Sequence, residues 1–194
     1  MATLRVLKVI VAAATRRRPG MLRALLASFA ALRVPERCEI SFLIVENDDR
    51  SSIAPVLDDF ANALPGPLVS VLETVPGIPR ARNRGFLEAD RLGGDLLLFV
   101  DDDETVAEDW LVEHIAWFRQ TQAGLIGGPV QVTPPGALPF WQSLVHRGMA
   151  ERFAKKERRA ARLAGSDKVE QITIVTNNWL ADMALYRERG LKFD

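Results

Sequence analysis

The fold is decided by one stretch, Leu96-Leu97-Leu98-Phe99-Val100-Asp101-Asp102-Asp103-Glu104. Its first five residues form a short, uninterrupted apolar run, which is typical of a parallel strand that is buried on both faces. Four acidic residues follow at once. The pattern therefore predicts a buried strand whose end carries a cluster of carboxylates.

On both sides of this stretch, strand-like and helix-like patterns alternate. Strands are expected at 4–13, 40–45, 68–73, 96–100, 125–133 and 172–175. Helices are expected from Pro19 through Leu32, at 53–64, 80–92 and 149–163, and after the capping-box pair Thr105 and Glu108, with a strand and then a helix within 179–189. The alternation predicts an α/β fold, a mainly parallel sheet with helices on both faces.

Composition narrows the classes of function. The formal net charge is zero, which gives no global attraction to nucleic acid, and no nucleic-acid partner is expected. The single cysteine, Cys38, cannot form an intrachain disulfide, which fits a reducing, cytoplasmic location. Residues 5–14 superficially resemble a short signal sequence, but Val9-Ile10-Val11 followed by three arginines favours a first strand.

Polar side chains follow four successive predicted strands. In parallel sheets, ligands bind beyond the carboxyl ends of the strands, so these residues are the candidates for a site. The four segments are Thr15-Arg16-Arg17-Arg18, Glu46-Asn47-Asp48-Asp49, Pro76 to Asn83, and Asp101-Asp102-Asp103-Glu104.

The acidic run indicates a divalent metal. Closely packed carboxylates repel one another unless a cation relieves them, and Mg²⁺ or Mn²⁺ takes oxygen ligands. Asp101 and Asp103 alternate, which places both carboxylates on one side of an extended segment. The alternative is a solvated acidic turn that caps the following helix.

The other strand ends fit a phosphorylated ligand. Arg80-Ala81-Arg82-Asn83 opens a helix whose N-terminus and guanidinium groups suit a diphosphate, although a basic surface turn has the same pattern. Of Arg16-Arg17-Arg18, one at most is expected to reach a ligand. Glu46 is able to accept a hydrogen bond from a nucleobase or a ribose hydroxyl, or to lie in water as a loop carboxylate.

In their order and spacing, these motifs resemble the family-two glycosyltransferases of the GT-A fold, above all bacterial enzymes that build exopolysaccharides and other surface glycans. The resemblance covers essentially the whole chain. It rests on Val11 to Pro19, Ile44 to Asp48, Gly77 to Asn83, Phe99 to Glu104, Gly128-Pro129-Val130 and Thr176-Asn177-Asn178.

The resemblance implies inverting transfer from a nucleoside-diphosphate sugar, usually a UDP-sugar, to a glycan or lipid-linked acceptor, with Mg²⁺ or Mn²⁺. By position, it places Thr15 and Glu46 at the nucleoside, Arg80, Arg82 and Asn83 near the uridine and diphosphate, and Asp101 at the ribose and metal, with Asp103 as a metal ligand. Arg17, Asp48 and Asp102 complete the expected nucleotide-sugar-binding set. Glu46 departs from the family, in which many members have aspartate.

The resemblance also divides the single expected domain, residues 1–194. Residues 1–104 correspond to the nucleotide-sugar-binding half and 105–194 to an incomplete acceptor half. Gly190 to Asp194 resembles a segment that precedes the usual general base, so the base is expected beyond Asp194, and residues 1–194 are expected to bind donor but transfer poorly. The basic segment 150–164 is expected to attract a lipid-diphosphate acceptor or the inner face of the membrane, or else to be an ordinary solvated helix.

Two other functions compete. Asp101 and Asp103 match the Asp-x-Asp-x-Thr pattern of haloacid-dehalogenase-like phosphatases, but that resemblance would place the motif on an early strand, whereas three strands precede it here. A non-catalytic nucleotide-sugar-binding module is the second alternative. A dehydrogenase would need Gly-x-Gly-x-x-Gly, which the chain lacks.

Overall fold

The computed structural model describes residues 5–133, 136–137, 139–164, 166, 168 and 171–194. Leu4, in the first expected strand, and Pro134 and Pro135, after the fifth, lie outside the described residues. The chain divides into two compact units, one of Met1–Ile126 with Thr176–Asp194 and one of Gly127–Val175. All the candidate nucleotide and metal residues lie in the first unit.

A mainly parallel sheet forms the centre of the first unit. Its strands are β1 (Leu7–Thr15), β2 (Cys38–Glu46), β3 (Leu68–Leu72), β4 (Leu96–Asp101), β5 (Leu125–Gly127) and β6 (Asn178–Asp182). Their order is β3-β2-β1-β4-β6-β5, in which β1 is parallel to β2 and β4, β2 is parallel to β3, and β6 is antiparallel to β4. The predicted α/β class is confirmed.

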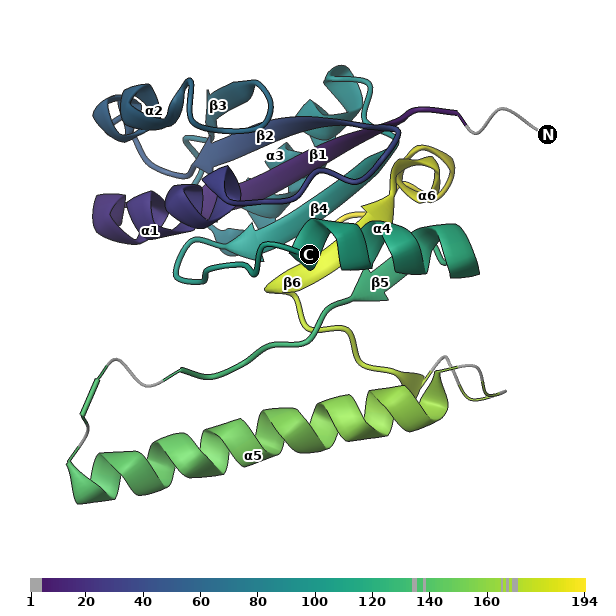
Figure 1. Cartoon of the computed structure of the whole chain (residues 1–194). Helices are drawn as coiled ribbons and strands as arrows, with labels where there is room; N and C mark the ends of the chain where they lie inside the picture. Colours follow the sequence, from purple (N-terminus) through teal and green to yellow (C-terminus); the bar gives the residue numbers. More distant parts are fainter. Residues whose placement is uncertain (1–4, 134–135, 138, 165, 167, 169–170) are drawn as a thin grey trace. The chain divides into compact units, whose positions relative to one another are not determined.

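Helices cover both faces of the sheet. Those of the first unit are α1 (Pro19–Ala30), α2 (Ala54–Phe60), α3 (Ile78–Arg91), α4 (Trp110–Thr121) and α6 (Met183–Arg189). α1 and α4 share one core with alternate residues of the central strands, including the fully buried Val9, Val11 and Leu98. Figure 1 shows α1 and α4 in front of the sheet and α3 behind it. Burial on both faces, about 1.5–3 kcal/mol per large apolar side chain, explains the uninterrupted apolar run of β4.

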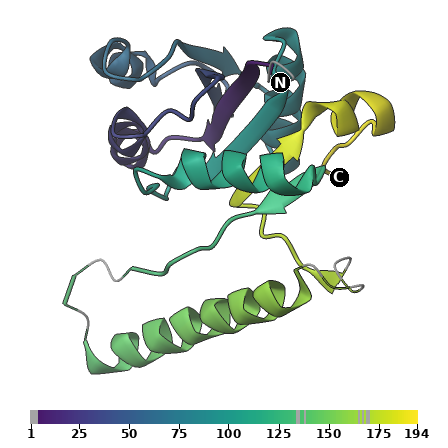
Figure 2. The same ribbon diagram turned by 45° about the vertical axis from the view of Figure 1, so that its right-hand side comes forward.

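Aromatic side chains fill the space between the other face and the last elements of the chain. Phe86 of α3 stacks on Tyr186 of α6 with ring centroids 5.2 Å apart, and Trp179 of β6 stacks on Phe99 of β4 at 5.5 Å. Figure 2 shows α6, in yellow, beside α3. These contacts confirm the strand followed by a helix that was predicted within 179–189.

Two predicted strands are wrong in extent or in kind. β5 ends at Gly127 instead of continuing to residue 133, because two glycines and Pro129, which has no N–H to donate, follow Ile126. Residues 172–175 form no strand despite their β-branched side chains. A strand needs a hydrogen-bonded neighbour, and propensity alone does not supply one.

Helix boundaries also differ from the predicted ones. The Thr105–Glu108 capping box does not start a helix: α4 begins at Trp110 and its N-cap, Asp109, makes no side-chain cap hydrogen bond. Contacts with α1 and the loop after it hold the intervening segment outside the helix, since Val106 donates its N–H to Ser28, and Arg33 donates its N–H to the carbonyl of Glu108.

The second unit contains one long helix, α5 (Phe140–Leu163), which starts nine residues before the predicted 149–163. Pro139 is its N-cap residue. Among the described residues, no helix has the length and apolar character needed to cross a membrane.

Candidate functional site

The carboxyl ends of the parallel strands lie side by side. In the strand register, Thr15 is paired with Glu46, and its neighbour Ala14 is paired with Asp101. β3 ends beside them, since Leu72 is paired with Glu46. The sheet therefore brings the four polar strand ends to one edge, as the parallel-sheet rule predicts.

The carboxylates of the acidic run after β4 differ in solvent exposure: one is buried and others are exposed. Asp102 is buried and accepts a 2.6 Å hydrogen bond from Oγ1 of Thr15. The side chains of Asp101 and Asp103 are 37% and 51% exposed. The hydrogen bond from Thr15 anchors the run to β1 through Asp102, and the expectation that Asp101 and Asp103 share one side of the segment stays a prediction.

Two arginines compensate the charge of this run. Arg18 lies 3.1 Å from Oδ1 of Asp102 and 3.5 Å from Oδ2 of Asp103, and Arg82 lies 3.0 Å from Oδ1 of Asp101. Carboxylates packed this closely repel one another unless a cation relieves the repulsion. Guanidinium groups of the protein itself supply part of that relief.

The environment of the run favours the protonated form of two carboxyl groups. Burial raises the pKa of Glu104 to about 7, the nearby charges of Asp101 and Asp103 raise it too, and a hydrogen bond from Nδ2 of Asn177 opposes the rise. Burial also raises the pKa of Asp101, against the effect of Arg82. An additional cation at this edge would favour the charged forms of both groups.

The oxygen ligands on the open side suit Mg²⁺ or Mn²⁺. Over the described ranges, no group of three or more His, Cys, Asp and Glu side chains is arranged to hold a metal ion. Asp101 and Asp103 instead fit an ion that is held by one or two carboxylates and completed by substrate phosphates. Their role as metal ligands stays a prediction.

The three candidate ligand-binding residues near the start of α3 differ in their burial and in their contacts. Arg82 is buried, lies against Asp101, and has its guanidinium 5.3 Å from the ring centroid of Phe193. Asn83 exchanges two 2.8 Å hydrogen bonds with the backbone of Phe193, which occupy both ends of its amide. Arg80 is exposed. Of the three, Arg80 has the most open side chain, whereas Asn83 is partly exposed.

An ion pair joins the loops after β1 and β2. Nε and Nη2 of Arg17 donate to the two carboxylate oxygens of Asp48 at 2.6 and 2.8 Å. The guanidinium holds the pKa of Asp48 well below its usual range. Arg17 has a φ of 55°, in the left-handed region that residues other than glycine rarely adopt. This bidentate pair therefore fixes an unusual loop conformation at the edge of the site.

Glu46 is buried, and its carboxylate forms hydrogen bonds within its own loop. Its carboxylate accepts hydrogen bonds from the hydroxyls of Ser51 and Ser52, at 2.9 and 2.6 Å, and from the backbone N–H of Ser52 at 2.8 Å. A carboxylate has about four lone-pair sites, so these three hydrogen bonds use most of them. The predicted contact of Glu46 with a nucleoside is untested.

Asn47 is a positioning residue that the sequence did not single out. It is buried, and its side-chain amide makes three hydrogen bonds, to the backbone of Glu73, Val75 and Gly77. Its place directly after a buried strand was the only available signal, because backbone partners leave no trace in the sequence.

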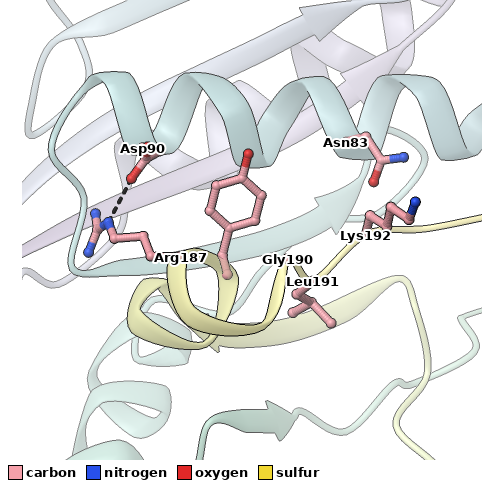
Figure 3. A pocket seen from close by; sticks show the side chains of 7 residues that line it. Asn83, Asp90, Arg187, Gly190, Leu191 and Lys192 are labelled. Carbon is pink, nitrogen blue, oxygen red and sulfur yellow. Dashed lines mark hydrogen bonds and ion pairs between the residues drawn. The ribbon is translucent and has the colours of Figure 1, made fainter.

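A hollow of about 560 Å³ lies apart from the acidic run, between α3 and the segment 186–192 (Figure 3). Asn83, Asp90 and Arg187 line it, and Arg187 donates a 2.7 Å hydrogen bond to Asp90. Asn83 is the one predicted site residue on its wall.

Sequence comparison places the chain among sugar-transferring proteins. The family model described as Glycosyl transferase family 2 matches residues 9–185. The succinoglycan biosynthesis protein ExoM of Rhizobium meliloti (strain 1021) is 34% identical over 127 residues, which are 66% of this chain and 40% of that protein. The chain therefore spans less than half the length of this relative.

Solved structures share the fold. S. aureus TarS 1-349 in complex with UDP has a TM-score of 0.68 at 16% identity, over 96% of this chain and 50% of that chain. The mannosyltransferase PcManGT from Pyrobaculum calidifontis, in complex with GDP-Man and Mn²⁺, has a TM-score of 0.65 at 18% identity, over 99% and 48%. At these identities the likeness shows the fold alone.

Proposed function

Since this chain belongs to glycosyl transferase family 2 and has the GT-A fold of its solved structural relatives, we propose that it transfers a sugar from a nucleoside-diphosphate sugar, with UDP as the nucleotide, to a glycan or lipid-linked acceptor in surface polysaccharide synthesis. One observation carries the proposal. The open carboxylates of Asp101 and Asp103 lie at the edge where β1, β2 and β4 end, which is where such sheets bind ligands.

The donor would lie across this edge, with its nucleoside toward the loops after β1 and β2. Thr15 and Glu46 end those strands, and the Arg17–Asp48 pair braces their loops. The diphosphate would lie toward the start of α3, where Arg80 is exposed and no side chain caps the helix N-terminus. Three further residues would shape the donor site indirectly, through the contacts that each makes within the protein: Arg82, Asn83 and Asp102.

The chemistry demanded of this site is stabilisation of a leaving diphosphate. When bound, Mg²⁺ or Mn²⁺ held by Asp101 and Asp103 supplies Lewis-acid stabilisation of that charge. Arg82 holds Asp101 in place, and Arg80 adds a positive charge where the diphosphate would lie. We propose that transfer inverts the anomeric centre, which requires a carboxylate to accept the proton of the acceptor hydroxyl.

The phosphatase alternative finds no support. It would make Asp101 a nucleophile, whereas the family match over 9–185 is to sugar transferases and Asp101 pairs with Arg82. A non-catalytic binding module is separated from an enzyme by turnover. Release of UDP from a panel of UDP-sugars, with p-nitrophenyl phosphate as the comparison substrate, distinguishes all three functions.

Calorimetry with UDP and GDP tests the donor site directly. We expect UDP to bind more tightly in Mn²⁺ than in EDTA, and Asp103→Ala to weaken UDP binding in Mn²⁺ but not in EDTA. Asp109→Ala is the matched control, because Asp109 is exposed and makes no side-chain cap hydrogen bond. Equal UDP affinity with and without EDTA would overturn metal-dependent binding, and a preference for GDP would overturn UDP as the nucleotide.

The acceptor side of the proposal rests on the basic segment 150–164. We propose that it attracts a lipid-diphosphate acceptor or the inner face of the membrane, so that the protein works at the cytoplasmic surface. Most of this segment lies in α5, whose second half carries the basic residues.

A further inference from the structure

α5 presents one face made of two contrasting halves. Residues 141, 145, 149, 152, 156 and 159 follow one another in steps of three or four, so they share one side of the helix. The first half of this face is apolar and exposed, and consists of Phe140, Trp141, Leu144, Val145 and Met149, at 79%, 64%, 49%, 58% and 49%. The second half consists of the exposed Arg152, Lys155, Lys156, Arg159 and Arg162.

The opposite side of α5 packs within its own unit. Glu157 accepts a 2.9 Å hydrogen bond from the backbone N–H of Val130, and Phe153 and Ala154 are partly buried. These contacts fix the rotation of the helix about its axis within the second unit. The two-part face therefore points away from the unit's own chain.

The positive charge of the face is not compensated. α5 carries seven cations and two carboxylates, and both carboxylates are engaged, Glu157 by Val130 and Glu151 by Arg158 at 2.6 Å. Within the part of the chain that the structure describes, the five cations of the face make no ion pair. An anionic partner would meet no local competition from acidic side chains.

We propose that this face, residues 140–162, docks on an anionic lipid bilayer. Trp141 and its apolar neighbours would enter the boundary between headgroups and acyl chains, while the five cations would contact anionic headgroups beside them. A second copy of the chain does not fit over the whole face, since its cations would be brought against these cations in parallel packing and against the apolar half in antiparallel packing. The inference rests on the proposed function for its purpose, which is to hold the transferase where a lipid-linked acceptor lies.

Co-sedimentation with vesicles tests the proposal without nucleotide or metal, so its failure and that of the donor site are distinguishable. We expect the chain to bind vesicles of phosphatidylcholine with phosphatidylglycerol and to bind pure phosphatidylcholine at least roughly tenfold more weakly. Lys155→Glu with Arg159→Glu should abolish the preference. Arg33→Glu, which reverses an exposed charge in the first unit, should bind like wild type.

The apolar half is tested by Trp141→Ser, with Trp117→Ser as the control, because Trp117 is 50% exposed on α4 of the first unit. We expect Trp141→Ser to bind anionic vesicles roughly tenfold more weakly and Trp117→Ser to bind unchanged. Brominated lipids should quench the tryptophan fluorescence of wild type but much less that of Trp141→Phe. Three results would each overturn the proposal: equal binding to neutral and anionic vesicles, wild-type binding by Trp141→Ser, or self-association without vesicles that Trp141→Ser abolishes.

Discussion

Oδ1 of Asn47 accepts the backbone N–H of Gly77 at 2.8 Å. Nδ2 of the same amide donates to the carbonyls of Glu73 and Val75 at 2.9 and 2.8 Å. Gly77, with a φ of 141°, is the N-cap residue of α3. One buried amide therefore joins the end of β2 to the loop after β3 and sets where the arginine-bearing helix begins.

Asn47→Ala should loosen this loop and weaken binding of UDP in Mn²⁺. Three backbone groups would lose their partner, and we expect a loss on the order of 1–3 kcal/mol in the free energy of unfolding. Urea unfolding and calorimetry measure the two effects, with the exposed Asn62→Ala as the control. Unchanged UDP affinity in a destabilised variant would restrict Asn47 to a structural role.

Thr15→Val should destabilise the fold through Asp102. Valine keeps the shape of threonine but removes the hydroxyl, which donates a 2.6 Å hydrogen bond to this buried carboxylate. Hydrogen bonds to charged groups contribute about 1.5–3 kcal/mol, and the remaining contact with Arg18 places the expected loss near the lower end. Thr15→Ser retains the donor and should unfold at nearly the wild-type urea concentration. A Thr15→Val variant as stable as wild type would contradict this account.

Glu104 should make stability depend on pH when no divalent metal is present. Burial raises its pKa to about 7 in the folded protein, above the usual value near 4.5, so the folded state retains this proton longer than the unfolded state. This contribution is fully present below about pH 4.5 and is lost as pH rises through about 7.

Glu104→Gln removes the titrating group and keeps a similar shape. Urea unfolding in EDTA at pH 5 and pH 8 should show a smaller loss of stability for this variant than for wild type. Glu113→Gln, on α4, is the comparison, since Glu113 is exposed and lies outside the acidic run. The same pH dependence in Glu104→Gln and wild type would show that other groups cause it.

Local sequence patterns predicted the central elements because both faces of those strands are buried. The apolar run of β4 and the helical spacing of Leu22, Leu25 and Phe29 lie in the core as expected. Predictions failed where tertiary contacts determine the secondary structure. Residues 172–175 have strand propensity but no strand partner, and the segment with the Thr105 capping box is bound to Ser28 of α1 outside any helix.

The candidate site was predicted as a set of strand ends, and the register confirms that they meet at one edge. The sequence did not show which of these side chains already form hydrogen bonds with other groups of the protein. Asn83 binds the backbone of Phe193, and Glu46 binds two serines of its own loop. Such partners are backbone atoms or common polar residues, whose pairing depends on the fold and not on a motif.

Arg82 and Arg80 should differ in what their loss affects, although they lie two residues apart. Arg82 is buried against Asp101 with its guanidinium 5.9 Å from the ring centroid of Phe99, so Arg82→Gln should lower both the free energy of unfolding and the affinity for UDP in Mn²⁺. Arg80 is exposed, so Arg80→Gln should weaken UDP binding by roughly tenfold, since a hydrogen bond to a charged group contributes about 1.5–3 kcal/mol, and leave stability nearly unchanged. Calorimetry at two salt concentrations and urea unfolding separate the effects, because screening weakens an exposed charge more than a buried one. If Arg80→Gln binds UDP like wild type at low salt, Arg80 does not contact the diphosphate.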